Sequence, residues 1–144
     1  MKVLFPGSFD PFTIGHADIV DRTLAFADEV VIAIGVHPEK KGVATPEDRK
    51  AQIEAVYKDN PRVSVDIYEV LTTDFAKSLG IAVIIRGVRS ITDFEYERNI
   101  AEINRQLTGI ETLLLFADPR HEAVSSSVVR ELQSYGKDVS QYLP

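Results

Sequence analysis

The chain has 144 residues, of which 44% are hydrophobic and 26% charged, and its formal net charge at pH 7 is −6. This length favours one domain, and we expect it to span residues 1–144; the acidic balance argues against nucleic acid as a partner. The absence of cysteine excludes disulfide scaffolds and thiolate metal sites. No apolar run reaches the roughly 18 residues of a membrane span, and MKVLFPGSFD is too short for the apolar core of a signal peptide. We therefore expect a cytoplasmic protein without membrane contact.

Short apolar runs that do not alternate with polar residues predict five strands. They cover residues 3–5, 30–36, 63–65, 81–85 and 112–116. Continuous apolar character is typical of strands that are covered on both faces, as in a parallel sheet.

Segments with helical spacing lie between these runs. Ala17, Val20 and Leu24 share one face of the first segment. Thr45 followed by a proline and two acidic residues predicts the start of a helix that continues to about residue 57. A shorter helix is expected over 74–79, where Gly80 ends it.

The most clearly marked helix is predicted to begin at Thr92. Thr92 and Glu95 match a capping box, and Ile91 with Tyr96 matches a hydrophobic staple. This helix should end near residue 109, and a last helix should cover 126–135. We interpret one apolar stripe of the long helix as core: Tyr96, Ile100, Ile103 and Leu107. The alternation of strands and helices predicts a doubly wound α/β domain, a Rossmann-like five-stranded parallel sheet with helices on both faces.

Residues suited to phosphate chemistry follow the carboxyl ends of several predicted strands, where ligands bind in such sheets. They are Gly7, Ser8, Asp10 and His16 after the first strand, His37, Lys40 and Lys41 after the second, Arg86 and Arg89 after the fourth, and Arg120, His121 and Ser125–Ser127 after the fifth. Cations and helix N-termini on one rim would hold several negative charges.

Each feature also has a plainer interpretation. Gly7 can be turn punctuation, His16 a cap or packing residue, and Arg86 the partner of an acid; Lys40 can be a solvated loop residue. At least one of the three serines should be only an N-cap. The common position after strand ends favours the phosphate site.

The motif GSFDPFTIGH resembles the N-terminal signature of nucleotidyltransferases with a His-x-Gly-His motif, with Thr13 in place of the first histidine. Together with IRGVRSITDFEYE (84–97) and VSSSVVRE (124–131), it makes nearly the full chain similar to the bacterial phosphopantetheine adenylyltransferases. That family transfers AMP from ATP to 4′-phosphopantetheine, which gives dephospho-coenzyme A and pyrophosphate. The resemblance also implies Mg²⁺ with the nucleotide and a homohexamer.

The resemblance assigns roles to individual residues. His16 would stabilise charge on the α-phosphate, and Lys40 and Arg86 would hold the incoming phosphate. The acceptor site would contain Ser8, Lys40, Thr72, Arg86 and Asn104. The ATP site would contain Ser8, Phe9, His16, Gly87, Val88, Arg89, Glu97, His121, Glu122, Ala123, Val124, Ser125, Ser126 and Ser127. The metal ligands are not assigned, and Asp10 either orders the first loop or lies near the metal.

The chain departs from the family at two places. Glu122–Val124 stands where relatives often have an aromatic-rich segment, and the sequence ends at SQYLP where relatives commonly add a helix. The alternatives are a related enzyme acting on nicotinate mononucleotide or glycerol phosphate, and a non-catalytic nucleotide-binding module. A tRNA-synthetase fragment is disfavoured because 144 residues leave no room for an anticodon-type domain.

The expected reaction needs little covalent chemistry from the protein. A phosphomonoester is already anionic near neutral pH, so no general base is required, and positioning and electrostatic stabilisation carry most of the catalysis. We therefore expect direct in-line attack without an adenylylated enzyme.

Overall fold

The computed structural model describes residues 1–37 and 42–144, and within them the chain forms a five-stranded parallel sheet. The strand order is β3-β2-β1-β4-β5. The strands are β1 (Lys2–Gly7), β2 (Glu29–Gly35), β3 (Val63–Tyr68), β4 (Val83–Val88) and β5 (Glu111–Phe116). This order confirms the Rossmann-like fold expected from the sequence, and it puts the topological switch point between β1 and β4.

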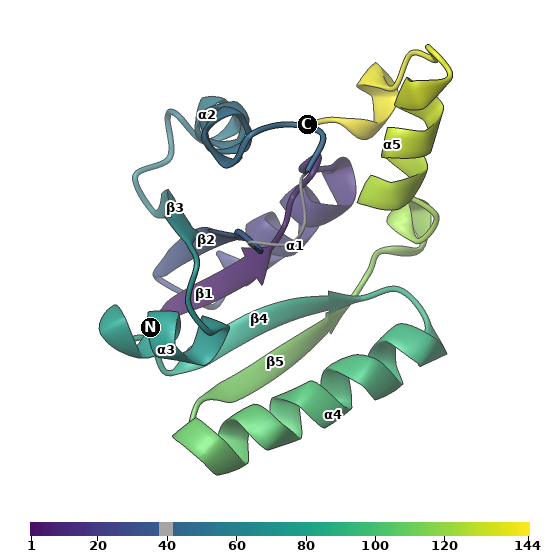
Figure 1. Ribbon diagram of the computed structural model, residues 1–144. Helices are drawn as coiled ribbons and strands as arrows, with labels where there is room; N and C mark the ends of the chain where they lie inside the picture. The colour runs from purple at the N-terminus through teal and green to yellow at the C-terminus, as the bar shows by residue number, and fades with distance from the viewer. Residues whose placement is uncertain (38–41) are drawn as a thin grey trace.

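In the part of the chain that the structure describes, five α-helices alternate with the strands (Figure 1). They are α1 (Ile14–Thr23), α2 (Pro46–Val56), α3 (Thr72–Ser78), α4 (Ile91–Thr108) and α5 (Ser126–Ser134), with short 3₁₀ turns η1 (Pro119–His121) and η2 (Ser140–Tyr142). In Figure 1 the chain passes from the arrowhead of β5 to α5, which therefore lies on the side of the carboxyl strand ends.

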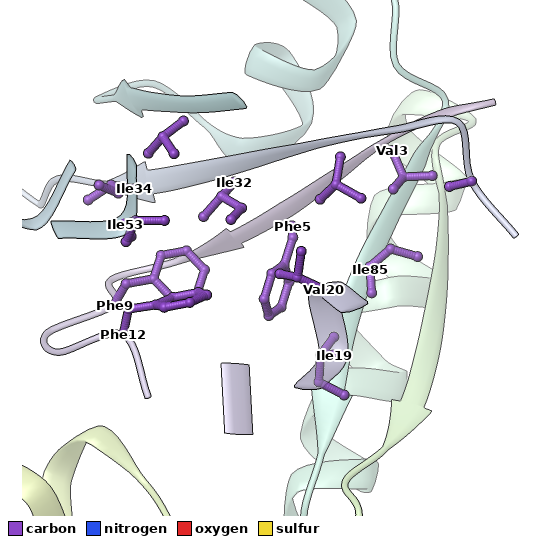
Figure 2. Packing of buried hydrophobic residues seen from close by; sticks show 13 residues of the cluster. Val3, Phe5, Phe9, Phe12, Ile19, Val20, Ile32, Ile34, Ile53 and Ile85 are labelled. Atoms are coloured by element: carbon purple, nitrogen blue, oxygen red, sulfur yellow. The ribbon is translucent and has the colours of Figure 1, made fainter. Parts of the chain in front are cut away.

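The sheet buries apolar side chains on both faces. On one face, Phe5 and Ile32 of the sheet pack with Ile19 and Val20 of α1 and Ile53 of α2, as Figure 2 shows. The other face forms a second cluster in which Leu4, Val31, Ala33, Ile84 and neighbouring residues contact Ala76 of α3. The continuous apolar runs in the sequence thus reflect strands with a core on each side.

Several predicted helix ends are confirmed. Thr45 caps α2 by accepting from the Asp48 N–H (3.1 Å). Gly80, Gly109 and Gly136 adopt positive φ angles just after α3, α4 and α5, which is the conformation that favours glycine at a helix end.

The predicted start of α4 is wrong. The N-cap is Ser90, whose hydroxyl accepts from the Asp93 N–H (3.1 Å), so the capping box of Thr92 does not form. Ile91 is 80% exposed and cannot act as a staple. Ser90 and Thr92 both carry a hydroxyl group, and Ser90, whose own backbone is extended, takes the cap.

The interpretation of the α4 stripe as core is also wrong for the single chain. Tyr96 is 64% exposed, Ile103 54% and Leu107 74%, and Ile100 is exposed as well. The only side chain of α4 that is buried is that of Glu97. The helix therefore turns a polar residue inward toward β4 and an apolar stripe outward.

Among residues 1–37 and 42–144, no helix is both long and apolar enough to span a bilayer.

Candidate active site

A cavity of about 380 Å³ lies beyond the carboxyl ends of β1 and β4, at the switch point of the sheet. The first turn of α1 and the first turn of α5 both contribute to its wall, through Gly15 and His16 and through Ser126 and Ser127. Free backbone N–H groups and the helix dipole make each of these ends favourable for an anion. We call this space the nucleotide cavity.

His16 is held at the third position of α1 by Thr13, the N-cap residue. The Thr13 N–H donates to Nδ1 of His16 (3.0 Å), and the Thr13 hydroxyl accepts from the His16 N–H (3.4 Å). The pair forms a capping box in which a histidine replaces the usual acidic or amide side chain. Because Nδ1 accepts a hydrogen bond, the neutral ring carries its proton on Nε2.

The His16 ring is packed among three aromatic residues, Phe5, Phe9 and Phe12. It stacks on Phe12 with ring centroids 5.4 Å apart and meets Phe9 edge-on at 5.0 Å. This burial, with the positive charges of Arg89 and Arg86, lowers the pKa of His16 from 6.5 to about 4. At neutral pH the site therefore presents a neutral imidazole with one N–H donor.

The loop between β1 and α1 folds back on its own glycine. Phe9 has a positive φ of 50°, and its side chain is only 2% exposed. A Cβ atom at Gly7 would lie 2.9 Å from the Phe9 ring, so Gly7 is required by close approach and not by a positive φ.

Arg86 is paired with an acid and is also part of the cavity wall. Its Nε and Nη2 donate to the two carboxylate oxygens of Glu97 (2.9 and 2.7 Å), and Nη1 donates to the Pro6 carbonyl (2.7 Å). A guanidinium group has five N–H bonds, so this arrangement leaves donors for a ligand. The ion pair with Glu97 therefore orients Arg86 without using all of its N–H donors.

The three serines have three different partners. Ser125 is the N-cap of α5 and accepts from the Val128 N–H (3.2 Å), as the plainer interpretation expected for one of them. Ser126 donates to the Pro11 carbonyl (2.7 Å). Ser127 accepts from Arg130 (3.2 Å). The start of α5 is thus tied to the loop before α1.

A second cavity of about 710 Å³ adjoins the first. Both are lined by Pro6, Gly7, Ser8, Arg86, Tyr96 and Glu97. The rest of the second wall is largely apolar, with Val36, Val70, Leu71, Ile84, Ile100 and Ala101, together with the acidic Glu69 and the polar His37, Tyr68, Thr72, Asn104 and Thr112. We call this space the acceptor cavity.

Most of the residues that the resemblance assigned to the two substrates line one of these cavities, and Ser8, Arg86 and Glu97 line both. The nucleotide cavity is lined by Ser8, Phe9, His16, Gly87, Arg89, Glu97, His121, Val124 and Ser125–Ser127, and the acceptor cavity by Ser8, Thr72, Arg86 and Asn104. Val88 is buried and lines neither, and Glu122 and Ala123 are exposed and line neither. Lys40 lies outside the described residues.

Sequence reasoning missed several residues that shape the site. The family resemblance marks Thr13 only as the replacement of a histidine, although a threonine three positions before His16 at a helix start has the spacing of a capping box. Arg130 lines the nucleotide cavity, and Tyr68 lines the acceptor cavity. No pattern in the sequence marks these two side chains as close to the loop at Ser8.

The side chains of the site suit a metal ion that is bound mainly by the phosphates of a nucleotide. Within the described part of the chain, no group of three His, Asp or Glu side chains is arranged to hold a metal ion. Asp10, the acid in the loop between β1 and α1, uses both carboxylate oxygens to accept from the N–H groups of Val43 (2.8 Å) and Ala44 (3.3 Å). Mg²⁺ commonly needs few protein ligands when substrate phosphates supply the rest, so these residues fit a nucleotide-borne ion.

The chain is similar to known proteins over nearly its whole length. Residues 4–132 match the model of the cytidylyltransferase-like family. A phosphopantetheine adenylyltransferase of Bacteroides thetaiotaomicron is 52% identical over 99% of this chain and 95% of its own length. A protein of the same name from Leuconostoc citreum is 45% identical over 98% of this chain and 90% of its own.

Solved structures support the fold. A bifunctional NMN adenylyltransferase/ADP ribose pyrophosphatase of Francisella tularensis, crystallised with AMP and a Mn ion, superposes with a TM-score of 0.74. The match covers 99% of this chain and 44% of that protein at 18% identity, so it bears on the fold alone. From the family match and the close relatives, the chain belongs to the cytidylyltransferase-like family, among its phosphopantetheine adenylyltransferases, and is a nucleotidyltransferase.

Proposed function

We propose that this protein transfers the AMP part of ATP to 4′-phosphopantetheine, which gives dephospho-coenzyme A and pyrophosphate. The observation that carries the proposal is the pair of adjoining cavities that share Pro6–Ser8 and Arg86. A cavity with two helix N-termini suits the phosphates of a nucleotide. A cavity with largely apolar walls suits the extended pantetheine part of the acceptor. The names of the relatives support the same reaction and a role in coenzyme A biosynthesis.

The transfer is proposed to be direct. An oxygen of the pantetheine phosphate forms a bond to the α-phosphorus of ATP, and the bond from that phosphorus to the bridging oxygen of pyrophosphate breaks. The attacking phosphate is an anion, so no proton has to be removed first. In this scheme no enzyme group is adenylylated, and the configuration at the α-phosphorus inverts.

The residues of the nucleotide cavity would stabilise the charge that grows during this step. His16 would donate Nε2–H to an oxygen of the α-phosphate, and its neutral state is supported by the lowered pKa. Arg86, at the wall common to both cavities, would offset repulsion between the two phosphoryl groups. The N-terminus of α5 at Ser126 would bind the phosphates that leave. By resemblance, Lys40 would hold the acceptor phosphate.

Mg²⁺ is proposed as the metal ion, held by the phosphates of ATP. When bound, it would neutralise charge on the pyrophosphate part. The commitment of the Asp10 carboxylate to two backbone N–H groups supports a site in which the nucleotide brings the ion.

The protein is further proposed to act as a homo-oligomer, a hexamer by resemblance, built on one domain in the cytoplasm, where ATP is available. The exposed Ile103 and Leu107 on α4, which line neither cavity, support a protein contact, because large exposed apolar patches commonly mark interfaces. Leu107→Glu should lower the mass measured by light scattering; an unchanged mass would exclude this stripe as the interface.

The test of the function is an assay of isolated protein with ATP, Mg²⁺ and 4′-phosphopantetheine. We expect dephospho-coenzyme A, identified by mass spectrometry, and an equal amount of pyrophosphate. Nicotinate mononucleotide and glycerol phosphate should give little pyrophosphate. Faster release with either of these, or binding of ATP without turnover on any acceptor, would contradict the proposal.

A further inference from the structure

The loop Ser8–Pro11 is hydrogen-bonded to Arg49 of α2. Arg49 lines neither the nucleotide cavity nor the acceptor cavity. Arg49 is only 6% exposed. Its Nη1 donates to the Ser8 carbonyl (2.5 Å), and its Nε donates to the Ala44 carbonyl (3.2 Å). One guanidinium group thus bridges two segments that are far apart in the sequence.

Asp10 connects the same two segments in the opposite sense. Its carboxylate accepts from the N–H groups of Val43 and Ala44, while Arg49 donates to the carbonyl of Ala44. The packing is close: a Cβ atom on Gly42 would lie 2.6 Å from an Asp10 oxygen. Residues 42–44 and 8–10 are therefore joined by donors and acceptors on both sides.

The bond to Ser8 has a directional consequence for the next residue. In a trans peptide the C=O and N–H groups point in opposite directions. A donor that fixes the Ser8 carbonyl toward Arg49 therefore fixes the Phe9 N–H away from α2. Phe9 itself has the unfavourable φ of 50° and lines the nucleotide cavity. Such a backbone conformation persists only when neighbouring contacts hold it.

We propose that Arg49 and Asp10 are positioning residues for nucleotidyl transfer: they lock the Ser8–Phe9 peptide against residues 42–44, so that the Phe9 N–H is aimed at a substrate phosphate. This inference rests on the proposed function. It also chooses between the two roles that the sequence left open for Asp10, because its carboxylate orders the loop and leaves the metal to the nucleotide.

The guanidinium group is specifically required, because two carbonyls must be reached at once. The ammonium group of lysine is a single point donor on a flexible stem and cannot span both in one fixed plane. Arg49→Lys should therefore keep the charge but release one of the two segments.

Arg62 offers a matched control. It too donates to backbone carbonyls, those of Asp28 (2.9 Å), Leu24 (2.6 Å) and Ala27 (2.7 Å). It precedes β3, at the amino end of the strands, and it lines neither cavity. Arg62→Lys thus loses the same kind of contact without touching the loop at Ser8.

The experiment measures kcat, the KM for each substrate and Tm for Arg49→Lys, Arg62→Lys and the parent, with ATP and 4′-phosphopantetheine, well below the lowest Tm. We expect kcat to fall between about tenfold and a hundredfold in Arg49→Lys and to stay within about twofold in Arg62→Lys, even if both lose Tm. Parental kcat in a folded Arg49→Lys, or equal losses in the two variants, would overturn the proposal.

A second variant, Asp10→Asn, tests the proposal if Arg49→Lys does not fold. Asp10→Asn keeps the side-chain size but replaces one acceptor oxygen with an NH₂ group, which cannot accept from a backbone N–H. It should lower kcat while the Mg²⁺ concentration for half-maximal rate stays unchanged. A shift in that Mg²⁺ concentration would assign Asp10 to the metal and overturn its positioning role.

The outcome for the parent protein separates this inference from the proposed function. If the parent makes no dephospho-coenzyme A, the proposed function fails, and ATP affinity measured by calorimetry replaces kcat as the readout. Weaker ATP binding by Arg49→Lys than by Arg62→Lys would then support positioning of the loop. Equal affinities would overturn it.

Discussion

The two cavities on either side of Arg86 are built in different ways. In the nucleotide cavity, polar groups are fixed before any ligand binds: Thr13 holds the ring of His16, and Ser126 ties α5 to Pro11. In the acceptor cavity, most of the wall is apolar, and Tyr68 and Thr72 pair with each other (2.8 Å). Fixed donors suit charge that develops during a reaction, whereas apolar walls provide contact area for binding.

This difference predicts different kinetic consequences. A donor that interacts only with the transition state changes kcat, and a contact made equally in the ground state changes KM. Substitutions in the nucleotide cavity should thus act on turnover, and those in the acceptor cavity on substrate affinity.

The largest effect is expected for His16→Ala. Loss of one preorganised donor should lower kcat by about 10²–10³, with little change in ATP affinity measured by calorimetry. His37→Ala is the comparison, because His37 lines the acceptor cavity; it should act mainly on the KM for the phosphopantetheine substrate. If His16→Ala retained the parental kcat, the ring would have only the packing role suggested by its aromatic neighbours.

The second prediction concerns stability at acid pH. The pKa of His16 is about 4 in the folded chain and 6.5 as the reference for the unfolded chain. Above pH 6.5 neither state binds the proton, and as pH falls from 6.5 to 4 only the unfolded state binds it, so the folded state loses stability. At pH 4.5 this effect of His16 lowers the free energy of unfolding by about 2–3 kcal/mol relative to neutral pH.

Urea unfolding at pH 7.5 and pH 4.5 measures this loss, with His16→Gln as the reference that cannot titrate. The parent should lose more free energy of unfolding than His16→Gln between these two pH values. An equal loss in both proteins would mean that the folded chain accommodates a charged imidazole.

The sequence predicted the parts of the molecule that depend on local pattern. Solid apolar runs indicated a sheet with a core on both faces, and the cap at Thr45 follows from short-range chemistry. The expectation that His16, Arg86 and Ser126 would share one rim follows from the direction of parallel strands, and all three line the nucleotide cavity.

The rest depends on contacts between distant segments. Arg86 pairs with Glu97, and Arg49 donates to the Ser8 carbonyl. The spacing of these residues in the sequence does not reveal either contact. The prediction that the apolar stripe of α4 belongs to the core is wrong for the single chain, because helical periodicity identifies an apolar face but not what covers it. Ile103 and Leu107 are exposed in the single chain, although their spacing is that of a core helix.

The third prediction tests the wall between the cavities. Glu97→Gln keeps the shape of the side chain but removes the charge that orients Arg86, so kcat/KM should fall by about tenfold. Glu102→Gln is the matched control: Glu102 pairs with Arg105 on the same helix through both oxygens (3.1 and 2.5 Å), but at an exposed position. Steady-state kinetics should show a near-parental value for this control. Similar losses in both variants would point to a general effect on α4.

The smallest effect is expected in the acceptor cavity, for Thr72→Val. The change removes the hydroxyl that pairs with Tyr68 and keeps the volume, so the KM for the phosphopantetheine substrate should rise by about three- to tenfold. The KM for ATP and kcat should stay unchanged, because Thr72 does not line the nucleotide cavity. Ser78→Ala, which removes an exposed hydroxyl from the same helix, should change neither KM. A rise in the KM for ATP with Thr72→Val would show that ATP binds in the cavity lined by Thr72. The assignment of the two substrates to the two cavities would then have to be reversed.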